Sequence, residues 1–174
     1  MKLSKNYIQS KDIDWFCCID DIYIHVASAG GELPDIVNDY NKLRGIQEAA
    51  SKLPDIYKDE EIEINDTFIR SELEKNIRQL QEKDIYYGNY DINKGVEDYT
   101  STFKIMARKG FTSYDRTHIS ELEDNHYHWV ARPRKISSCP QINIPMVRTN
   151  NSHLQNNVDE LDLIDLLRDG KVVR

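Results

Sequence analysis

The chain has 174 residues, a formal net charge of −7 and charged side chains at 30% of its positions. A chain of this length can fold as one domain that buries roughly 70% of its unfolded surface, so it needs no disulfide or structural metal to be stable. The negative charge argues against binding to nucleic acid or to anionic membranes, because both require a positive protein surface.

The N-terminal segment and the cysteines bear on cellular location. Residues 1–14 lack the apolar core of a signal peptide, and no later run reaches the roughly 18 apolar residues of a membrane span. The cysteines, Cys17, Cys18 and Cys139, are odd in number, and neighbours in a strand point to opposite faces. We therefore expect a cytoplasmic protein with reduced cysteines and no membrane partner.

Residues 15–28 read WFCCIDDIYIHVAS and predict two short strands around a turn at Asp20 and Asp21. With a two-residue turn, one face of this hairpin is apolar throughout and must be buried. Its residues are Trp15, Cys17, Ile19, Ile22, Ile24 and Val26. The opposite face is half polar and can be either exposed surface or a site. Its residues are Phe16, Cys18, Tyr23 and His25.

Apolar residues at helical spacing predict three helices in the middle of the chain. They lie near residues 35–53, 67–82 and 92–109. Pro34 suits the first position of the first helix, whereas Asp91 can cap the third helix and Gly110 can end it. The third helix has the most regular apolar stripe, formed by Ile92, Val96, Tyr99, Phe103 and Met106.

Alternating residues near 111–116 and 126–132 predict two more strands, which we place in one mostly antiparallel sheet with the N-terminal hairpin. The basic run RPRK at 132–135 has no interleaved aromatic side chains, so we interpret it as a solvated strand end. The order of strands and helices predicts an α+β fold in which the helices pack on one face of the sheet.

Composition divides the chain into three parts. Residues 1–135 are expected to form a single α+β domain, and residues 136–156 read as a polar linker or edge segment. Residues 157–174 predict a C-terminal amphipathic helix and tail. Such a helix can bury its apolar stripe by packing on its own domain, or by docking on a protein partner or a second copy through residues 157–169.

The segment IHVASAGGELPD at 24–35 joins a predicted strand to a predicted helix and could belong to a site. A phosphate cradle is disfavoured, because Glu32 and Asp35 would repel an anion and Pro34 removes a backbone donor. A nucleophile elbow matches only half of the Gly-x-Ser-x-Gly pattern, because Val26 stands at the position of the first glycine.

His25 and Ser28 remain a candidate base and nucleophile, although their odd separation puts them on opposite faces of a regular strand. Asp115 beside His25 or His128 would give a base near neutral pH, with Arg116 as a charge clamp. The alternative is that Asp115 and Arg116 simply end a strand. The candidate catalytic residues are therefore His25, Ser28, Asp115 and His128, and the candidate ligand-binding residues are Tyr23, Ser113, Tyr114 and Arg116.

His126 and His128 share one face of the predicted strand and are candidate metal ligands. A metal site would need a third ligand such as His118, Asp115 or His25 to converge on them. No cysteine or carboxylate has the spacing of a familiar metal motif. We therefore favour two histidines on a partly wet strand face, and we expect no cofactor.

Two functions from different classes fit these observations. We favour a small acidic protein-interaction or accessory module, because every candidate site in the sequence is incomplete. The alternative is a small enzyme or small-ligand-binding domain with a His/Asp/Ser site on the sheet, with or without the help of a metal. A structure bears on the alternative by showing whether His25, Asp115 and His128 converge.

Overall fold

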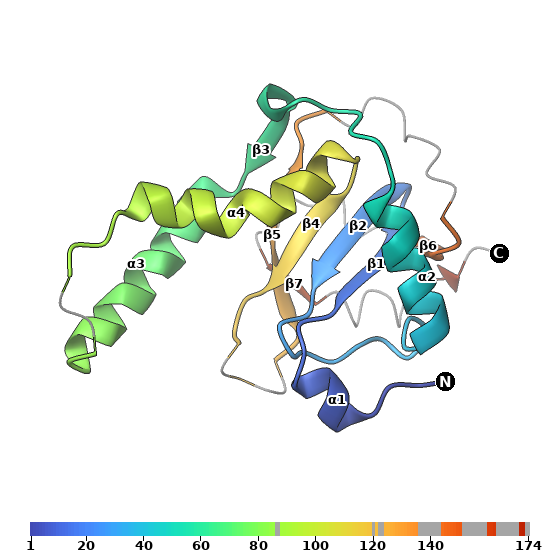
Figure 1. Ribbon diagram of the computed structural model, residues 1–174, viewed down its shortest axis with the longest axis horizontal. Coiled ribbons are helices and arrows are strands. Elements are labelled where there is room, and N and C mark those ends of the chain that lie inside the picture. The colour runs from blue at the N-terminus through green and yellow to red at the C-terminus, as the bar shows by residue number, and fades with distance from the viewer. Residues whose placement is uncertain are drawn as a thin grey trace.

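A computed structural model describes residues 1–85, 88–119, 121, 124–135, 144–150, 160–162 and 171–172 and confirms the predicted α+β class (Figure 1). The helices are α1 (Lys5–Gln9), α2 (Tyr40–Ser51), α3 (Asp66–Glu82) and α4 (Ile92–Arg108), with a short 3-10 helix, η1, at Asp59–Glu61. The strands are β1 (Asp14–Ile19), β2 (Ile22–Ala27), β3 (Ile62–Ile64), β4 (Thr112–Arg116), β5 (His126–Pro133), β6 (Val147–Asn150), β7 (Glu160–Asp162) and β8 (Lys171–Val172).

The strands form one mixed sheet in the order β3-β5-β4-β2-β1-β6-β8, and β7 pairs with the end of β5 that β3 leaves free. The expectation of a mostly antiparallel sheet needs correction, because β2 pairs with β4, and β1 pairs with β6, in parallel. The path from β2 through α2, α3 and α4 to β4 is a long crossover, and such a connection is what allows two strands to run in parallel.

The N-terminal hairpin is confirmed, with β1 and β2 paired antiparallel. Asp20 and Asp21 form its two-residue turn, with φ angles of 49° and 63°. These left-handed angles are those of a type I′ turn, and Asp adopts them more easily than most residues do. The predicted apolar face lies in the main hydrophobic core, with Ile22 at its margin.

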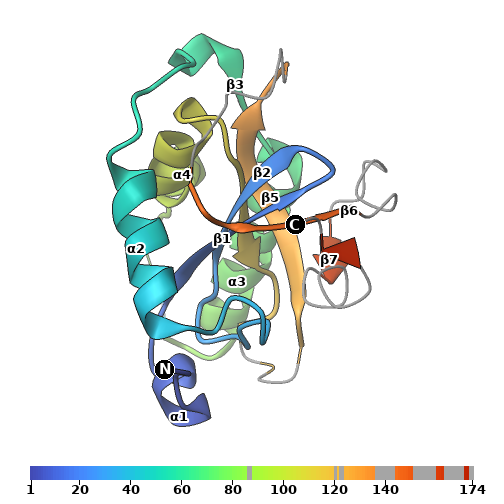
Figure 2. The same cartoon turned by 90° about the vertical axis from the view of Figure 1, so that its right-hand side faces the viewer.

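Helices α2 and α4 lie on one face of the sheet, as the side view shows (Figure 2). The hairpin face that carries Phe16, Cys18 and Tyr23 is buried beneath them, so this half-polar face is not exposed surface. Phe16 packs edge to face against Phe111, with ring centroids 5.3 Å apart. Helix α4 packs over β4 and β5, and α3 packs against α4.

The predicted bounds of α3 and α4 are confirmed, and Asp91 caps α4 as expected. Helix α2, however, begins at Tyr40 instead of near residue 35. Asp39 caps it by accepting a hydrogen bond from a backbone N–H of the first turn. The preceding residues form a separate turn, in which the Val37 N–H donates to the Pro34 carbonyl at 2.9 Å. Pro34 therefore lies in that turn and not in the helix.

Most of the predicted linker at 136–156 and of the predicted C-terminal helix at 157–174 lies outside the described residues. The described parts of 157–174, Glu160–Asp162 and Lys171–Val172, are strands, so a helix over the whole segment is not supported. Strand β7 satisfies backbone groups on the open edge of β5, which a helix could not do. Association through residues 157–169 stays a prediction.

In the described part of the chain, no helix combines the length and the apolar character that crossing a membrane requires.

Gly30 and Gly45 give a matched test of the turn between β2 and α2. Gly30 has a φ of 78°, and a Cβ there would lie 2.9 Å from the Gln9 carbonyl oxygen, whereas a Cβ at Gly45 in α2 would meet no described atom within 4 Å. We expect Gly30→Ala to lower the free energy of unfolding by about 1–2 kcal/mol and Gly45→Ala to raise it by about 0.5–1 kcal/mol. Urea unfolding measures both, and equal effects would contradict the turn geometry.

Candidate functional site

The register of the central strands places a row of polar side chains on the helix-covered face of the sheet. Asp14 in β1 is opposite Ala27 in β2, Ala27 is opposite Asp115 in β4, and Asp115 is opposite His128 in β5. Side chains at paired positions point to the same side of a sheet. Asp14, Asp115 and His128 therefore share this face, with the small Ala27 between the two aspartates.

Tyr99 on α4 joins two members of this row. Its hydroxyl oxygen lies 2.7 Å from Asp115 Oδ2 and 3.0 Å from His128 Nε2. On the other side of the imidazole, Thr117 Oγ1 lies 3.2 Å from His128 Nδ1. Asp115 Oδ1 accepts a further hydrogen bond from the Arg116 backbone N–H at 2.8 Å. Thr117, His128, Tyr99 and Asp115 thus form one hydrogen-bonded series, which we call the polar chain.

The chemistry of each group sets the direction of these hydrogen bonds when Asp115 is ionised. A carboxylate only accepts, so the Tyr99 hydroxyl donates to it, and the Tyr99 oxygen then accepts from the His128 Nε2–H. In that tautomer His128 Nδ1 carries no proton and accepts from Thr117. When Asp115 takes up a proton, every bond can reverse and His128 takes the Nδ1–H tautomer. The polar chain therefore has two complete hydrogen-bonded states that differ by one proton.

Burial shifts the pKa values of the polar chain in opposite directions. Desolvation raises the pKa of Asp115 to about 6, although the hydrogen bonds from Tyr99 and from the Arg116 N–H lower it. Desolvation, followed by the charge of His118, lowers the pKa of His128 to about 4. Burial, followed by the negative charge of Asp115, raises the pKa of Tyr99. At neutral pH Asp115 is therefore ionised, while His128 and Tyr99 are neutral.

His25 lies in the neighbouring row, between Asp14 and Ser113. Its Nδ1 is 3.2 Å from Ser113 Oγ, and its Nε2 is 3.2 Å from Asp14 Oδ1, where the angle is not that of a hydrogen bond. The order Asp, His, Ser is that of a hydrolase triad. However, Ser113 is fully buried, and its hydroxyl donates to the Phe103 carbonyl at 3.3 Å. Ser113 therefore positions His25 and cannot act as a nucleophile in this arrangement.

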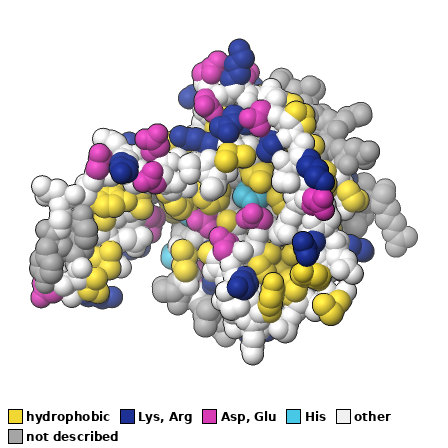
Figure 3. Space-filling model, in the orientation of Figure 1, with side chains coloured by type: hydrophobic (Ala, Val, Ile, Leu, Met, Phe, Trp, Pro, Cys, Tyr) yellow, Lys and Arg dark blue, Asp and Glu magenta, His cyan; other side chains and the backbone are white. Residues whose placement is uncertain are grey.

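Carboxylates lie at the solvent-exposed end of the row that Asp14, Ala27, Asp115 and His128 form. Figure 3 shows acidic side chains and a histidine at the surface between α2 and α4. The Asp14 side chain is half-exposed, and the exposed Asp12 accepts a hydrogen bond from the Ala29 N–H at 2.8 Å. The charge of Asp12 raises the pKa of Asp115, and that of His25 lowers it. We call Asp12, Asp14 and Asp115 together the acidic face.

Ser28, the candidate nucleophile, is buried and bonded to the backbone around it. Its hydroxyl oxygen accepts from the Ile13 N–H at 2.9 Å, and its carbonyl accepts from the Gly31 N–H at 2.7 Å. These bonds close the turn after β2. The Ser28 hydroxyl therefore serves the backbone and not His25.

The four predicted ligand-binding residues divide between two sides of the sheet. Ser113 contacts His25, as described above. The Tyr23 hydroxyl accepts from Arg148 Nη2 at 3.0 Å within the core near α2. Tyr114 lies in the main core, where burial raises its pKa to about 12. Arg116 is 1% exposed and donates to three backbone carbonyl oxygens, so it stabilises the surrounding loops.

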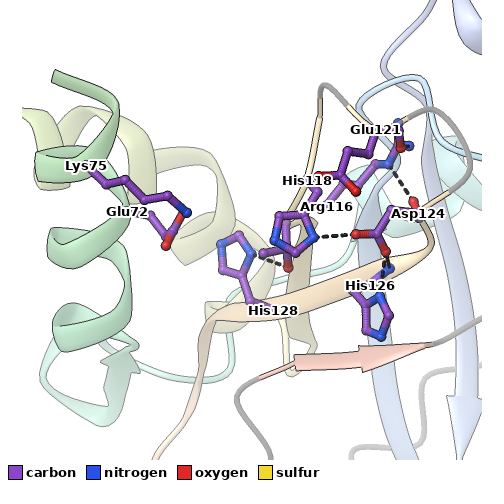
Figure 4. Close-up of polar contacts among 9 residues, drawn as sticks. Glu72, Lys75, Arg116, His118, Glu121, Asp124, His126 and His128 are labelled. Carbon is purple, nitrogen blue, oxygen red and sulfur yellow. Dashed lines mark hydrogen bonds and ion pairs between the residues drawn. The ribbon is translucent and has the colours of Figure 1, made fainter. Parts of the chain in front are cut away.

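His126 and His128 point in different directions (Figure 4). Asp124 lies between His118 and His126: its Oδ2 contacts His118 Nδ1, and its Oδ1 is 2.5 Å from His126 Nδ1. His128 instead points toward α3 and α4. Within the described ranges, no group of three or more His, Cys, Asp or Glu side chains is arranged to hold a metal ion.

Tyr99, Thr117 and Asp14 are the residues that sequence reasoning missed. Tyr99 fits the apolar stripe of its helix, so its pattern indicated core packing only. The signal that could have found it is the hydroxyl itself, because a buried Tyr O–H requires a hydrogen-bond partner. Thr117 and Asp14 stand at strand ends, where polar residues are ordinary.

The candidate site thus combines a polar chain from α4, β4 and β5 with an acidic face that extends to β1. Comparisons with protein-family models, with curated proteins and with solved structures find no match for this chain.

Proposed function

We propose that this protein binds a small polar ligand at the acidic face and exchanges a proton with it through Asp115. The observation that carries the proposal is the Tyr99 hydroxyl, which lies within hydrogen-bond distance of both Asp115 and His128. A carboxyl with a pKa of about 6 can both give and take a proton near neutral pH, as general acid–base catalysis requires.

The surrounding charges favour a ligand with a basic nitrogen. Asp12 acts on Asp115 through its negative charge, and Asp14 lies two strands away from Asp115 in the same row. An amine that takes the proton of Asp115 becomes an ammonium ion, which donates hydrogen bonds to carboxylates and is attracted by their charge, whereas an anion is repelled. A small amine is therefore the ligand class that we propose.

The polar chain can replace the proton that Asp115 gives to a bound amine. The Tyr99 hydroxyl proton moves to Asp115, the His128 Nε2 proton moves to Tyr99, and the Thr117 hydroxyl proton moves to His128 Nδ1. Thr117 is half-buried and recovers a proton from water. One solvent proton is consumed, Asp115 ends protonated, and His128 stays neutral while it changes tautomer.

Titration with ethylamine at neutral pH, followed by amide NMR shifts, tests this proposal. We expect shifts at Asp14, His25 and Asp115, and an affinity about tenfold weaker in Asp115→Asn, because a buried charge-assisted hydrogen bond contributes roughly 1.5–3 kcal/mol. Asp98→Asn on the exposed side of α4 changes the net charge equally and serves as the control. Equal weakening in both variants, or no shift at the acidic face, would show that the polar chain only stabilises the fold.

A further inference from the structure

A hollow with a volume of about 330 Å³ lies where α1, the residues just before β1, and α2 meet. Leu3, Ile13 and Leu43 line it with apolar surface that belongs to the main core or packs against it. Tyr7 and Tyr40 add two aromatic rings to the lining. This volume is at the lower end of the range for small-molecule sites, which suits one ring with a substituent.

Two cationic side chains line the same hollow. Arg44 is held against Tyr40: its Nη1 donates to the Tyr40 hydroxyl at 3.2 Å, and its guanidinium carbon lies 5.8 Å from the ring centroid. Lys11 is exposed, and the described contacts give it no ion-pair partner. Asp12 of the acidic face also lines the hollow and accepts a hydrogen bond from the Ala29 N–H, so the two cations exceed the negative charge of the lining by one. Figure 3 shows basic side chains beside a hydrophobic area below α2.

We propose that this hollow binds an amphipathic organic anion, which is an aromatic or aliphatic group that carries a carboxylate, sulfonate or phosphate. The apolar part of such a ligand covers the leucine and tyrosine surface, and the anionic part meets Lys11 and Arg44. An amine is repelled by both cations. The hollow therefore selects the opposite charge from the acidic face, and this inference does not depend on the function proposed above.

Phenyl phosphate is a suitable probe, with phenol and inorganic phosphate as its two halves. We expect phenyl phosphate to bind the full chain at least tenfold more tightly than either half at low salt, with amide NMR shifts at Tyr7, Lys11 and Arg44. Lys11→Gln and Arg44→Gln should each weaken the affinity about fivefold, as expected for partly exposed ion pairs. Lys42→Gln, at an exposed position of α2 outside the hollow, should leave the affinity unchanged.

Two outcomes would overturn the proposal. If phenyl phosphate binds no more tightly than inorganic phosphate, the apolar lining contributes nothing. If Lys42→Gln weakens binding as much as Lys11→Gln does, the probe senses only general surface charge. All three substituted side chains are exposed, so we expect each variant to keep the far-UV circular dichroism of the original protein.

Discussion

We expect Asp115→Asn to become more stable relative to the original protein as the pH rises, with its free energy of unfolding gaining about 2 kcal/mol between pH 4 and pH 6.5. The pKa of Asp115 is raised from 3.8 to about 6, so its stabilising contribution is present below pH 3.8 and is lost as the pH rises through 6. The pKa of His128 is lowered from 6.5 to about 4, so its contribution is present above pH 6.5 and is lost as the pH falls through 4. These two pH-dependent contributions to the free energy of unfolding nearly cancel in the original protein. In Asp115→Asn only the His128 contribution remains.

His128→Gln should give the opposite profile. Its free energy of unfolding, relative to the original protein, should fall by about 3 kcal/mol over the same pH range, because only the Asp115 contribution remains. Urea unfolding at a series of pH values measures all three proteins, and groups that titrate equally in each cancel in the differences. Parallel stability profiles for the three proteins would contradict the opposed pKa shifts.

Tyr99→Phe should lower the free energy of unfolding by about 2–3 kcal/mol at neutral pH, because it leaves two buried polar groups without a partner. The substitution removes only the hydroxyl and keeps the ring, which packs against Phe103 at a centroid distance of 5.6 Å. Asp115 loses a donor and His128 Nε2 loses its acceptor. The pKa of Asp115 should also rise above about 6, since the Tyr99 hydrogen bond lowers it.

Tyr57→Phe is the matched control for this substitution. Tyr57 is half-buried and packs against the same cluster as Tyr99, and its hydroxyl has no hydrogen bond among the described contacts. Urea unfolding gives the stability of both variants, and carboxyl NMR follows the Asp115 titration. A loss in Tyr99→Phe no greater than that in Tyr57→Phe would contradict the bridging role of the hydroxyl.

The parts of the fold that could be predicted from the sequence are those set by short-range rules. The hairpin depends on alternation over a few residues and on a turn at Asp20 and Asp21, and both lie within one short segment. The bounds of α4 follow from its apolar spacing and its Asp91 cap. The predicted start of α2 was wrong because Pro34 suits a turn as well as a helix start. Only the contacts of Asp39 show that the helix begins later, at Tyr40.

The neighbours of each strand could not be predicted, because they depend on distant segments. Nothing local in the sequence places β4 beside β2 in parallel, since three helices separate them along the chain. The same limit applies to the site. Asp115 and His128 stand out for their chemistry, but the hydroxyl that joins them comes from a helix whose Tyr99 reads as core. His25 contacts Asp14 and Ser113 instead of joining the polar chain.

The central claim is that the polar chain takes up one proton at Asp115 and reverses its hydrogen bonds. The most direct test is the tautomer of His128, read from the ¹⁵N shifts of its ring across the pH range in which Asp115 titrates. The claim predicts the Nε2–H tautomer above pH 6 and the neutral Nδ1–H tautomer below it, with no such change in Asp115→Asn. A His128 tautomer that stays the same throughout this range, or that changes equally in Asp115→Asn, would contradict it.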